Sequence, residues 1–171
     1  MVETDHYGES GKFRDADGNI WPYCHTGPHI CVLPICSGEM PRVGLIDEFK
    51  KVLGASRLKI PSDYRRGRPD NQETAMAILA AKTGILPSEV LHLVQTDILI
   101  PAWPVNIEYN TTVWFAWVRR PCGDKTVWLD MEDIANLLSP ARTGLDNPTS
   151  HVLDWVWRTV ERGEGFLPGE P

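Results

Sequence analysis

KIPSDYRRGRPDNQETAMAILAAKTGI, residues Lys59 to Ile85, is the most informative part of this 171-residue sequence. It starts within a short predicted strand, LKIP, and continues as a loop in which arginine is frequent. A helix is predicted through TAMAILAAKT, with Asp70 and Glu73 as a candidate capping pair and Gly84 as the C-terminal cap. The predicted helix is rich in alanine and almost uncharged.

Strands are predicted on both sides of this stretch. Phe13 and Trp21 flank Asp17-Gly18-Asn19 in a predicted hairpin, because the Asp-Gly step suits a tight turn. Apolar and β-branched segments predict further strands at residues 29–36, 43–49, 90–100, 111–119 and 125–129. Within the first of these segments, Pro34 implies an edge strand or a bulge.

Two more helices are predicted towards the C-terminal end. Asp130 is the expected cap of MEDIANLL, which Pro140 follows. The other helix covers residues 150–162, where apolar residues recur at helical spacing, namely Val152, Leu153, Val156 and Val160. The order of strands and helices predicts a mixed α+β or sandwich fold.

Composition and charge exclude several classes of protein. With 42% hydrophobic residues, 23% charged residues and a net charge of -6, the chain is not disordered, and general affinity for nucleic acid or anionic membranes is disfavoured. No apolar run approaches the roughly 20 residues of a membrane-spanning helix, and the first residues lack the apolar core of a signal peptide. Four cysteines are too few for a disulfide scaffold, so a cytoplasmic protein with reduced thiols is expected.

The stretch from Lys59 to Ile85 resembles the Nudix box together with the strand that leads into it, in the form common among ADP-ribose pyrophosphatases. Ile60-Pro61 matches the end of the family's strand and Thr83-Gly84-Ile85 matches the cap of its helix, with the spacing between them preserved. VGLIDEFKKVLG resembles the family's strand before the box, and KTVWLDMEDIANLL resembles its late strand and helix. The resemblance spans roughly residues 29 to 160, and it implies an α+β fold: a Nudix-like αβα sandwich with a mixed sheet, preceded by the short N-terminal hairpin.

The catalytic residues of the family do not carry over with the resemblance. Nudix hydrolases hold Mg²⁺ or Mn²⁺ on carboxylates of the box helix, because hard cations prefer oxygen ligands. The aligned positions carry other residues: Pro69 for the loop glutamate, Asp63 for the loop glycine, Ala77 and Ile78 for the Arg-Glu pair, and Ala81 and Lys82 for the two later glutamates. A degenerate Nudix box is therefore predicted, with its metal site lost and with no cofactor.

A basic loop takes the place of the expected acidic site. Between residues 50 and 68 the chain carries a net charge of +6, and four cations would surround the former metal site: Arg65, Arg66, Arg68 and Lys82. These cations could hold a phosphate or carboxylate without metal, and the alternative is a solvated loop. In the family, the loop that holds Trp103 shapes the substrate mouth, where an aromatic ring could stack on a nucleobase. Glu108, a further ligand-binding candidate, lies within one residue of the position of a family general base and is a candidate for a catalytic residue.

Three other sites are weighed against this one. A zinc site would use the ligand-capable residues Cys24, His25, His29 and Cys36, although their spacing is not a repeating CxxC pattern. Cys31 is expected to be a buried small hydrophobe, and Cys122 would need a partner base to act as a nucleophile. Arg66-Gly67-Arg68-Pro69 matches the core of an AT-hook, which inserts paired arginines into a narrow minor groove, but here it lies between a strand and a helix.

These observations predict an N-terminal segment with a hairpin at residues 1–28, a degenerate Nudix-like domain at residues 29–165 and a flexible tail at residues 166–171. The expected function is that of a catalytically inactive Nudix-fold protein that binds a phosphate-bearing, nucleotide-like small molecule or a protein partner. The alternatives are a Nudix-type hydrolase with non-standard catalytic residues and a nucleic-acid-binding Nudix-like domain. The resemblance also implies a homodimer, because ADP-ribose pyrophosphatases usually dimerise through N-terminal strands.

Overall fold

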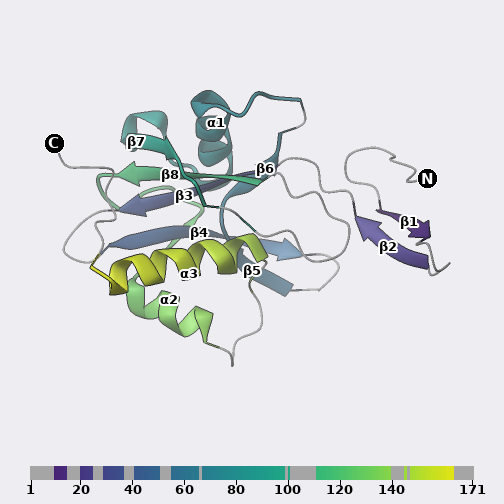
Figure 1. The fold of residues 1–171 in the computed structure, drawn as a ribbon. Coiled ribbons are helices and arrows are strands. Elements are labelled where there is room, and N and C mark those ends of the chain that lie inside the picture. Colours follow the sequence, from purple (N-terminus) through teal and green to yellow (C-terminus); the bar gives the residue numbers. More distant parts are fainter. Residues whose placement is uncertain are drawn as a thin grey trace.

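The structure is a computed structural model that describes residues 10–14, 20–24, 29–36, 41–50, 55–65, 67–98, 100, 111–139, 145 and 147–163 (Figure 1). The strands are β1 (Ser10–Arg14), β2 (Ile20–Cys24), β3 (His29–Cys36), β4 (Arg42–Lys50), β5 (Ala55–Lys59), β6 (Ser62–Tyr64), β7 (Val90–Gln95), β8 (Thr111–Val118) and β9 (Thr126–Leu129). The helices are α1 (Gln72–Thr83), the short 3-10 helix η1 (Pro87–Glu89), α2 (Met131–Leu138) and α3 (Asn147–Glu161). In this part of the chain, no helix has both the length and the apolar character needed to cross a bilayer.

A mixed sheet forms the centre of the molecule. Its strand order is β5-β4-β3-β8-β7, with β6 pairing with β3 and β9 pairing with β4. β3 and β8 run parallel, whereas β7 is antiparallel to β8 and β4 is antiparallel to β3. In the register of β3 and β4, only Ile35 and Cys36 lie opposite residues of β4. Beyond them β5 and β6 enter between the two strands, because β5 pairs with β4 and β6 pairs with β3.

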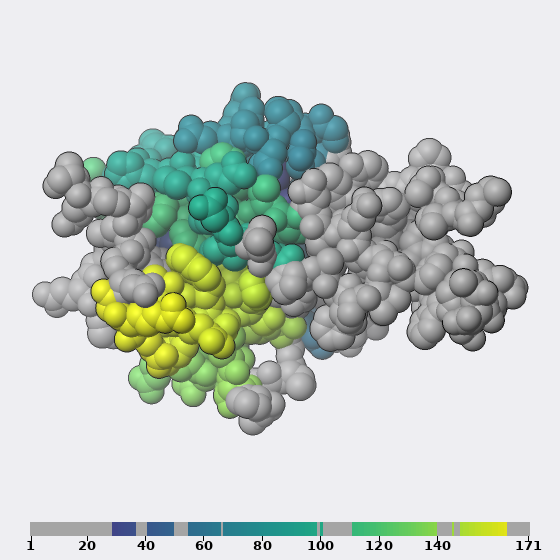
Figure 2. All heavy atoms as spheres, in the orientation of Figure 1, coloured from purple at the N-terminus to yellow at the C-terminus, as the bar shows by residue number. Residues whose placement is uncertain are grey.

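Helices cover both faces of this sheet (Figure 1). Successive residues of β3 point to opposite faces, so Ile30 packs against α1 with Ile78, and Leu33 packs against α2 and α3 with Ile134 and Leu153. Figure 2 shows α3, in yellow, lying across the surface beside α2. The predicted αβα sandwich with a mixed sheet is therefore confirmed.

The N-terminal hairpin has the expected pairing. β1 and β2 are antiparallel, with Phe13 opposite Trp21. The turn residues Asp17, Gly18 and Asn19 lie outside the described part of the chain.

Pro34 lies in a central strand, so the interpretation that it marks an edge is wrong. β3 has β8 on one side, where Pro34 is opposite Ala116, and β4 with β6 on the other side. Neither the β3–β4 register nor the β3–β6 register includes Pro34. Val32 donates its N–H to the carbonyl of Pro61 at 2.8 Å, and residues two apart in a strand face the same neighbour. Pro34, which has no N–H, therefore lies at a point of β3 where neither β4 nor β6 pairs with the strand, so no hydrogen bond between strands is lost there.

The C-terminal cap of α1 is the residue that the sequence predicts, whereas the N-terminal cap is a different one. Gly84 is the C-terminal cap, with φ of 77° and its N–H donating to the carbonyl of Ala80 at 2.9 Å. The N-terminal cap is Asn71 and not Asp70, because the Asn71 side chain accepts the N–H of Thr74 at 2.9 Å. Glu73 lies exposed in the first turn and is not a cap partner.

α2 begins where the sequence predicts, whereas α3 and β7 differ from their predicted bounds. Asp130 caps α2 in a capping box with Asp133, as predicted. α3 begins at Asn147, three residues before the expected start, and β7 ends at Gln95 instead of continuing to residue 100.

Candidate functional site

α1 is the helix at which the sequence resemblance places the Nudix box, and its two faces have different surroundings. Ile78 is 1% exposed and packs in the cluster between α1 and the sheet, together with Leu79. The opposite face is a stripe of residues spaced by four, in which Glu73, Ala77 and Ala81 are exposed. The exposed stripe therefore presents one carboxylate, in the first turn, followed by two methyl groups.

The basic loop before α1 is organised by its own arginines. The Nε–H of Arg68 donates to the carbonyl of Arg65 at 3.1 Å, and the Nε–H of Arg65 donates to the carbonyl of Arg68 at 3.2 Å. A terminal nitrogen of Arg68 also donates to the carbonyl of Tyr64 at 2.7 Å and forms an ion pair with Asp63 at 3.4 Å. Arg68 therefore closes the loop, and insertion into a DNA minor groove would require these contacts to break.

The expected cluster of four cations is only partly brought together. Arg65 and Arg68 share the loop before α1, whereas Lys82 lies in the last turn of the helix. Lys82 follows the cap residue Asn71 by eleven positions, which is about 16 Å along a helix axis. Arg66 lies outside the described residues, as do Trp103 and Glu108.

The four zinc candidates do not form one site. His29 and Cys36 are the first and last residues of β3, so they are about 23 Å apart along an extended strand. The His29 ring stacks on Tyr64 with 4.0 Å between centroids, and Cys36 is buried. The Cys24 side chain and His25 are outside the described part of the chain. Cys31 is 1% exposed in the core, which confirms its prediction as a buried hydrophobe.

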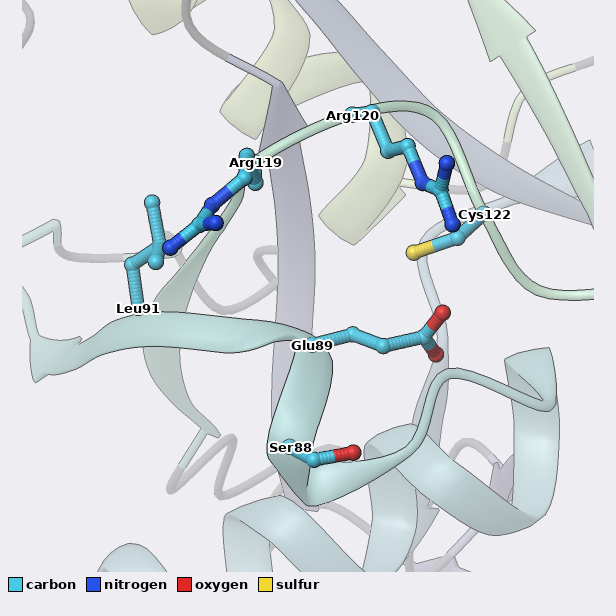
Figure 3. Close-up of a pocket in the computed structure, with 6 residues that line it drawn as sticks. All are labelled: Ser88, Glu89, Leu91, Arg119, Arg120 and Cys122. Carbon is cyan, nitrogen blue, oxygen red and sulfur yellow. The ribbon is translucent and has the colours of Figure 1, made fainter.

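A pocket of about 360 Å³ lies at the end of the β7–β8 pair where Val90 is opposite Val118. η1 and the start of β7 supply one side of the pocket, and the turn after β8 supplies the other (Figure 3). Its lining residues are Ser88, Glu89, Leu91, Arg119, Arg120 and Cys122. Of these, only Cys122 was a candidate from the sequence. The available signal was the pair of adjacent arginines at the end of a predicted strand.

Two acid groups of this pocket interact with each other. Burial raises the pKa of the Cys122 thiol, and the neighbouring Glu89 carboxylate raises it further, both by its charge and by its hydrogen bond with the thiol. Arg120 has the opposite but smaller effect on this pKa. Because the thiolate is the nucleophilic form, these surroundings oppose a nucleophilic role for Cys122.

Glu89 itself is held by the backbone. Its Oε2 accepts the N–H of Leu86 at 2.8 Å, which closes a capping box over η1. The carboxylate is thus fixed at the edge of the pocket and is already engaged by two donors, the Leu86 N–H and the Cys122 thiol.

Comparison with known structures defines the class of fold. The chain matches a Nudix hydrolase from M. Smegmatis, RenU, with a TM-score of 0.58 and 12% identity over 89% of this chain and 96% of that chain. It also matches a structure described as an ADP compounds hydrolase, with a TM-score of 0.54 and 15% identity over 91% of this chain and 87% of that chain. The chain therefore has a Nudix-like fold. No family model matches its sequence, and no curated protein matches it.

Proposed function

We propose that this chain is a Nudix-fold protein that does not hydrolyse diphosphates with metal and that acts by binding a nucleotide-like anion. The observation that carries the proposal is the make-up of α1, whose only carboxylate is Glu73. Mg²⁺ and Mn²⁺ need oxygen ligands, commonly carboxylates, and the bound cations in turn offset the negative charge of a phosphate substrate. A single carboxylate in the first turn of α1 does not meet this need.

The charge at the other end of α1 supports the binding part of the proposal. Lys82 occupies a position at which the family resemblance implies a glutamate, and it lies in the last turn of α1. An ammonium group repels a divalent cation but attracts a phosphate directly. The proposed ligand is therefore an anion that binds without a metal ion.

Hydrolysis and metal binding test the first half of the proposal. Purified protein should release no product from ADP-ribose with either Mg²⁺ or Mn²⁺, and calorimetric titration with Mn²⁺ alone should show no saturable binding. Metal-dependent turnover that disappears in Glu108→Gln or Glu73→Gln would contradict the proposal and favour a hydrolase with non-standard catalytic residues.

Titration with ADP-ribose in EDTA tests the second half. Binding should weaken as salt rises, and Lys82→Gln should weaken it several-fold, because one charge-assisted contact is lost. Arg158→Gln is the matched control, since it removes one positive charge from the exposed surface of α3, where Arg158 forms an ion pair with Asp154. Equal affinities for the two variants would overturn the role of Lys82.

A further inference from the structure

None of the residues that line the pocket beside Arg119 and Arg120 belongs to α1, although the turn after β8 contacts the C-terminal end of that helix, where the Lys125 N–H donates to the carbonyl of Thr83 at 3.1 Å. β8 runs from Thr111 to Val118, so its two ends are about 23 Å apart, and the pocket lies at the Val118 end. Lys82 does not line the pocket, so a ligand there would contact other residues than the one on which the binding proposed above rests.

The upper rim of the pocket, in the orientation of Figure 3, is formed by the Arg119 and Arg120 side chains. Both arginines are exposed, and both follow β8 directly. The ion pairs found among the described residues lie elsewhere, at Lys59–Glu48, Arg68–Asp63 and Arg158–Asp154. The guanidinium groups of Arg119 and Arg120 thus border the same pocket, and neither forms an ion pair with the described residues.

The lower rim is less charged and partly apolar. Ser88 offers a hydroxyl group, and the Leu91 side chain, 45% exposed, offers an apolar surface beneath Arg119 (Figure 3). Glu89 supplies the one negative charge among the lining residues, and its carboxylate is engaged by the Leu86 N–H and the Cys122 thiol. The lining therefore keeps a formal charge of +1 in a chain whose net charge is -6.

We propose that this pocket binds a small organic oxyanion, a carboxylate or a phosphate monoester, between Arg119 and Arg120, with the apolar part of the ligand on Leu91. A guanidinium group matches both oxyanions, because its N–H groups form paired hydrogen bonds to two oxygens. The volume of about 360 Å³ is at the lower end of the range for small-molecule sites. An inorganic ion alone would leave the surface of Leu91 uncovered, whereas an aromatic or aliphatic acid would cover it.

Phenyl phosphate and benzoate are suitable probes, because they share an apolar ring and differ in the oxyanion. Each is titrated into the ¹⁵N-labelled full chain at low ionic strength, and the backbone amide shifts are followed. Saturable shifts are expected at residues 88–91, at Arg119, Arg120 and Cys122, and not along the exposed stripe of α1. The probe that binds more tightly identifies the oxyanion class.

Variants separate a built site from general charge attraction. The double variant Arg119→Gln plus Arg120→Gln should weaken the preferred probe roughly tenfold or more, whereas Arg158→Gln should leave its affinity unchanged. Leu91→Ala should weaken phenyl phosphate more than inorganic phosphate. Because all three arginines are exposed, retention of the fold is expected and is checked by the amide spectrum.

Two results would overturn this inference. One is the absence of saturable binding by both probes, and the other is equal affinity in the double variant and in Arg158→Gln. The function proposed for α1 is tested separately, with ADP-ribose and Lys82→Gln, whereas this inference rests on Arg119 and Arg120, so the failure of one can be distinguished from the failure of the other.

Discussion

At position 78, the chain places an isoleucine where the Nudix resemblance implies a glutamate. Ile78 is 1% exposed and contributes to the core between α1 and the sheet. Its neighbour Ala77 is at the position for which the same resemblance implies an arginine, so apolar residues occupy both positions of the implied charged pair. A carboxylate at position 78 would now lie among apolar side chains, where an unpaired charge is strongly disfavoured.

Ile78→Glu should therefore lower the free energy of unfolding by about 3 kcal/mol or more, because it buries a carboxyl group without a partner. Ala81→Glu is the matched control: it introduces the same group on the same helix, but at an exposed position, and should change stability by at most about 0.5 kcal/mol. Urea unfolding followed by tryptophan fluorescence measures both values. Similar losses in the two variants would show that Ile78 is not a core residue.

At the scale of elements, α1 is defined by its caps more than by an amphipathic pattern. Asp70 and Asn71 are adjacent residues of similar shape, and either can cap a helix. The structure assigns the cap to Asn71, while Asp70 accepts the indole N–H of Trp114 at 3.2 Å. Trp114 is 44 residues away in sequence, so the choice between the two residues depends on where β8 lies.

The C-terminal cap of α1 predicts a difference between two glycines. Gly84 and Gly67 both have positive φ, at 77° and 78°. A side chain at Gly84 would collide with Asp124, whereas a side chain at Gly67 would meet nothing within 4 Å. Gly67→Ala should cost about 1 kcal/mol through backbone strain alone, and Gly84→Ala should cost clearly more.

Chemical denaturation of the two alanine variants measures this difference. Addition of Asp124→Ala should recover part of the loss in Gly84→Ala and none of the loss in Gly67→Ala. Equal costs for the two glycines would mean that the turn after β8 does not pack against the end of α1.

At the scale of the whole molecule, one buried hydrogen bond joins the C-terminal helix to the segment that leads into α1. The backbone N–H of Ile60 donates to Oγ1 of Thr149 at 2.9 Å, across 89 residues of sequence. Ile60 and Thr149 are both buried, so the amide has no access to water if this acceptor is removed. α3 thereby fixes the step between β5 and β6.

Thr149→Val should lower the free energy of unfolding by about 1 to 3 kcal/mol, because it preserves shape but leaves a buried N–H without its acceptor. Thr149→Ser keeps the hydroxyl oxygen and should cost less. Urea unfolding gives the two free energies, and hydrogen exchange should show faster exchange of the Ile60 amide in the valine variant. Equal stability of both variants would show that the hydroxyl group contributes nothing.

The elements themselves could be predicted from sequence, because they depend on contacts between near neighbours. The hairpin from β1 to β2, the strands β3, β4 and β8, and the caps Gly84 and Asp130 all follow from local patterns of apolar and turn residues. The Nudix-like sandwich followed from the order and spacing of such segments. The residues that occupy the metal-ligand positions of the family can also be identified directly along the chain.

Tertiary structure was needed wherever residues distant in sequence meet. It placed Pro34 in a central strand, because the pairing of β3 with β4 and β6 leaves an interval at that residue. The separation of His29 from Cys36, and of Lys82 from the basic loop, follows already from the secondary structure, since an extended strand and a helix hold these residues apart. Tertiary structure also brought Ser88 and Glu89 to Arg119 and Arg120, which lie about thirty residues away in sequence. Sequence alone therefore determined the elements and the chemistry of α1, whereas the sheet order, which depends on long-range pairing, decided which side chains share a pocket.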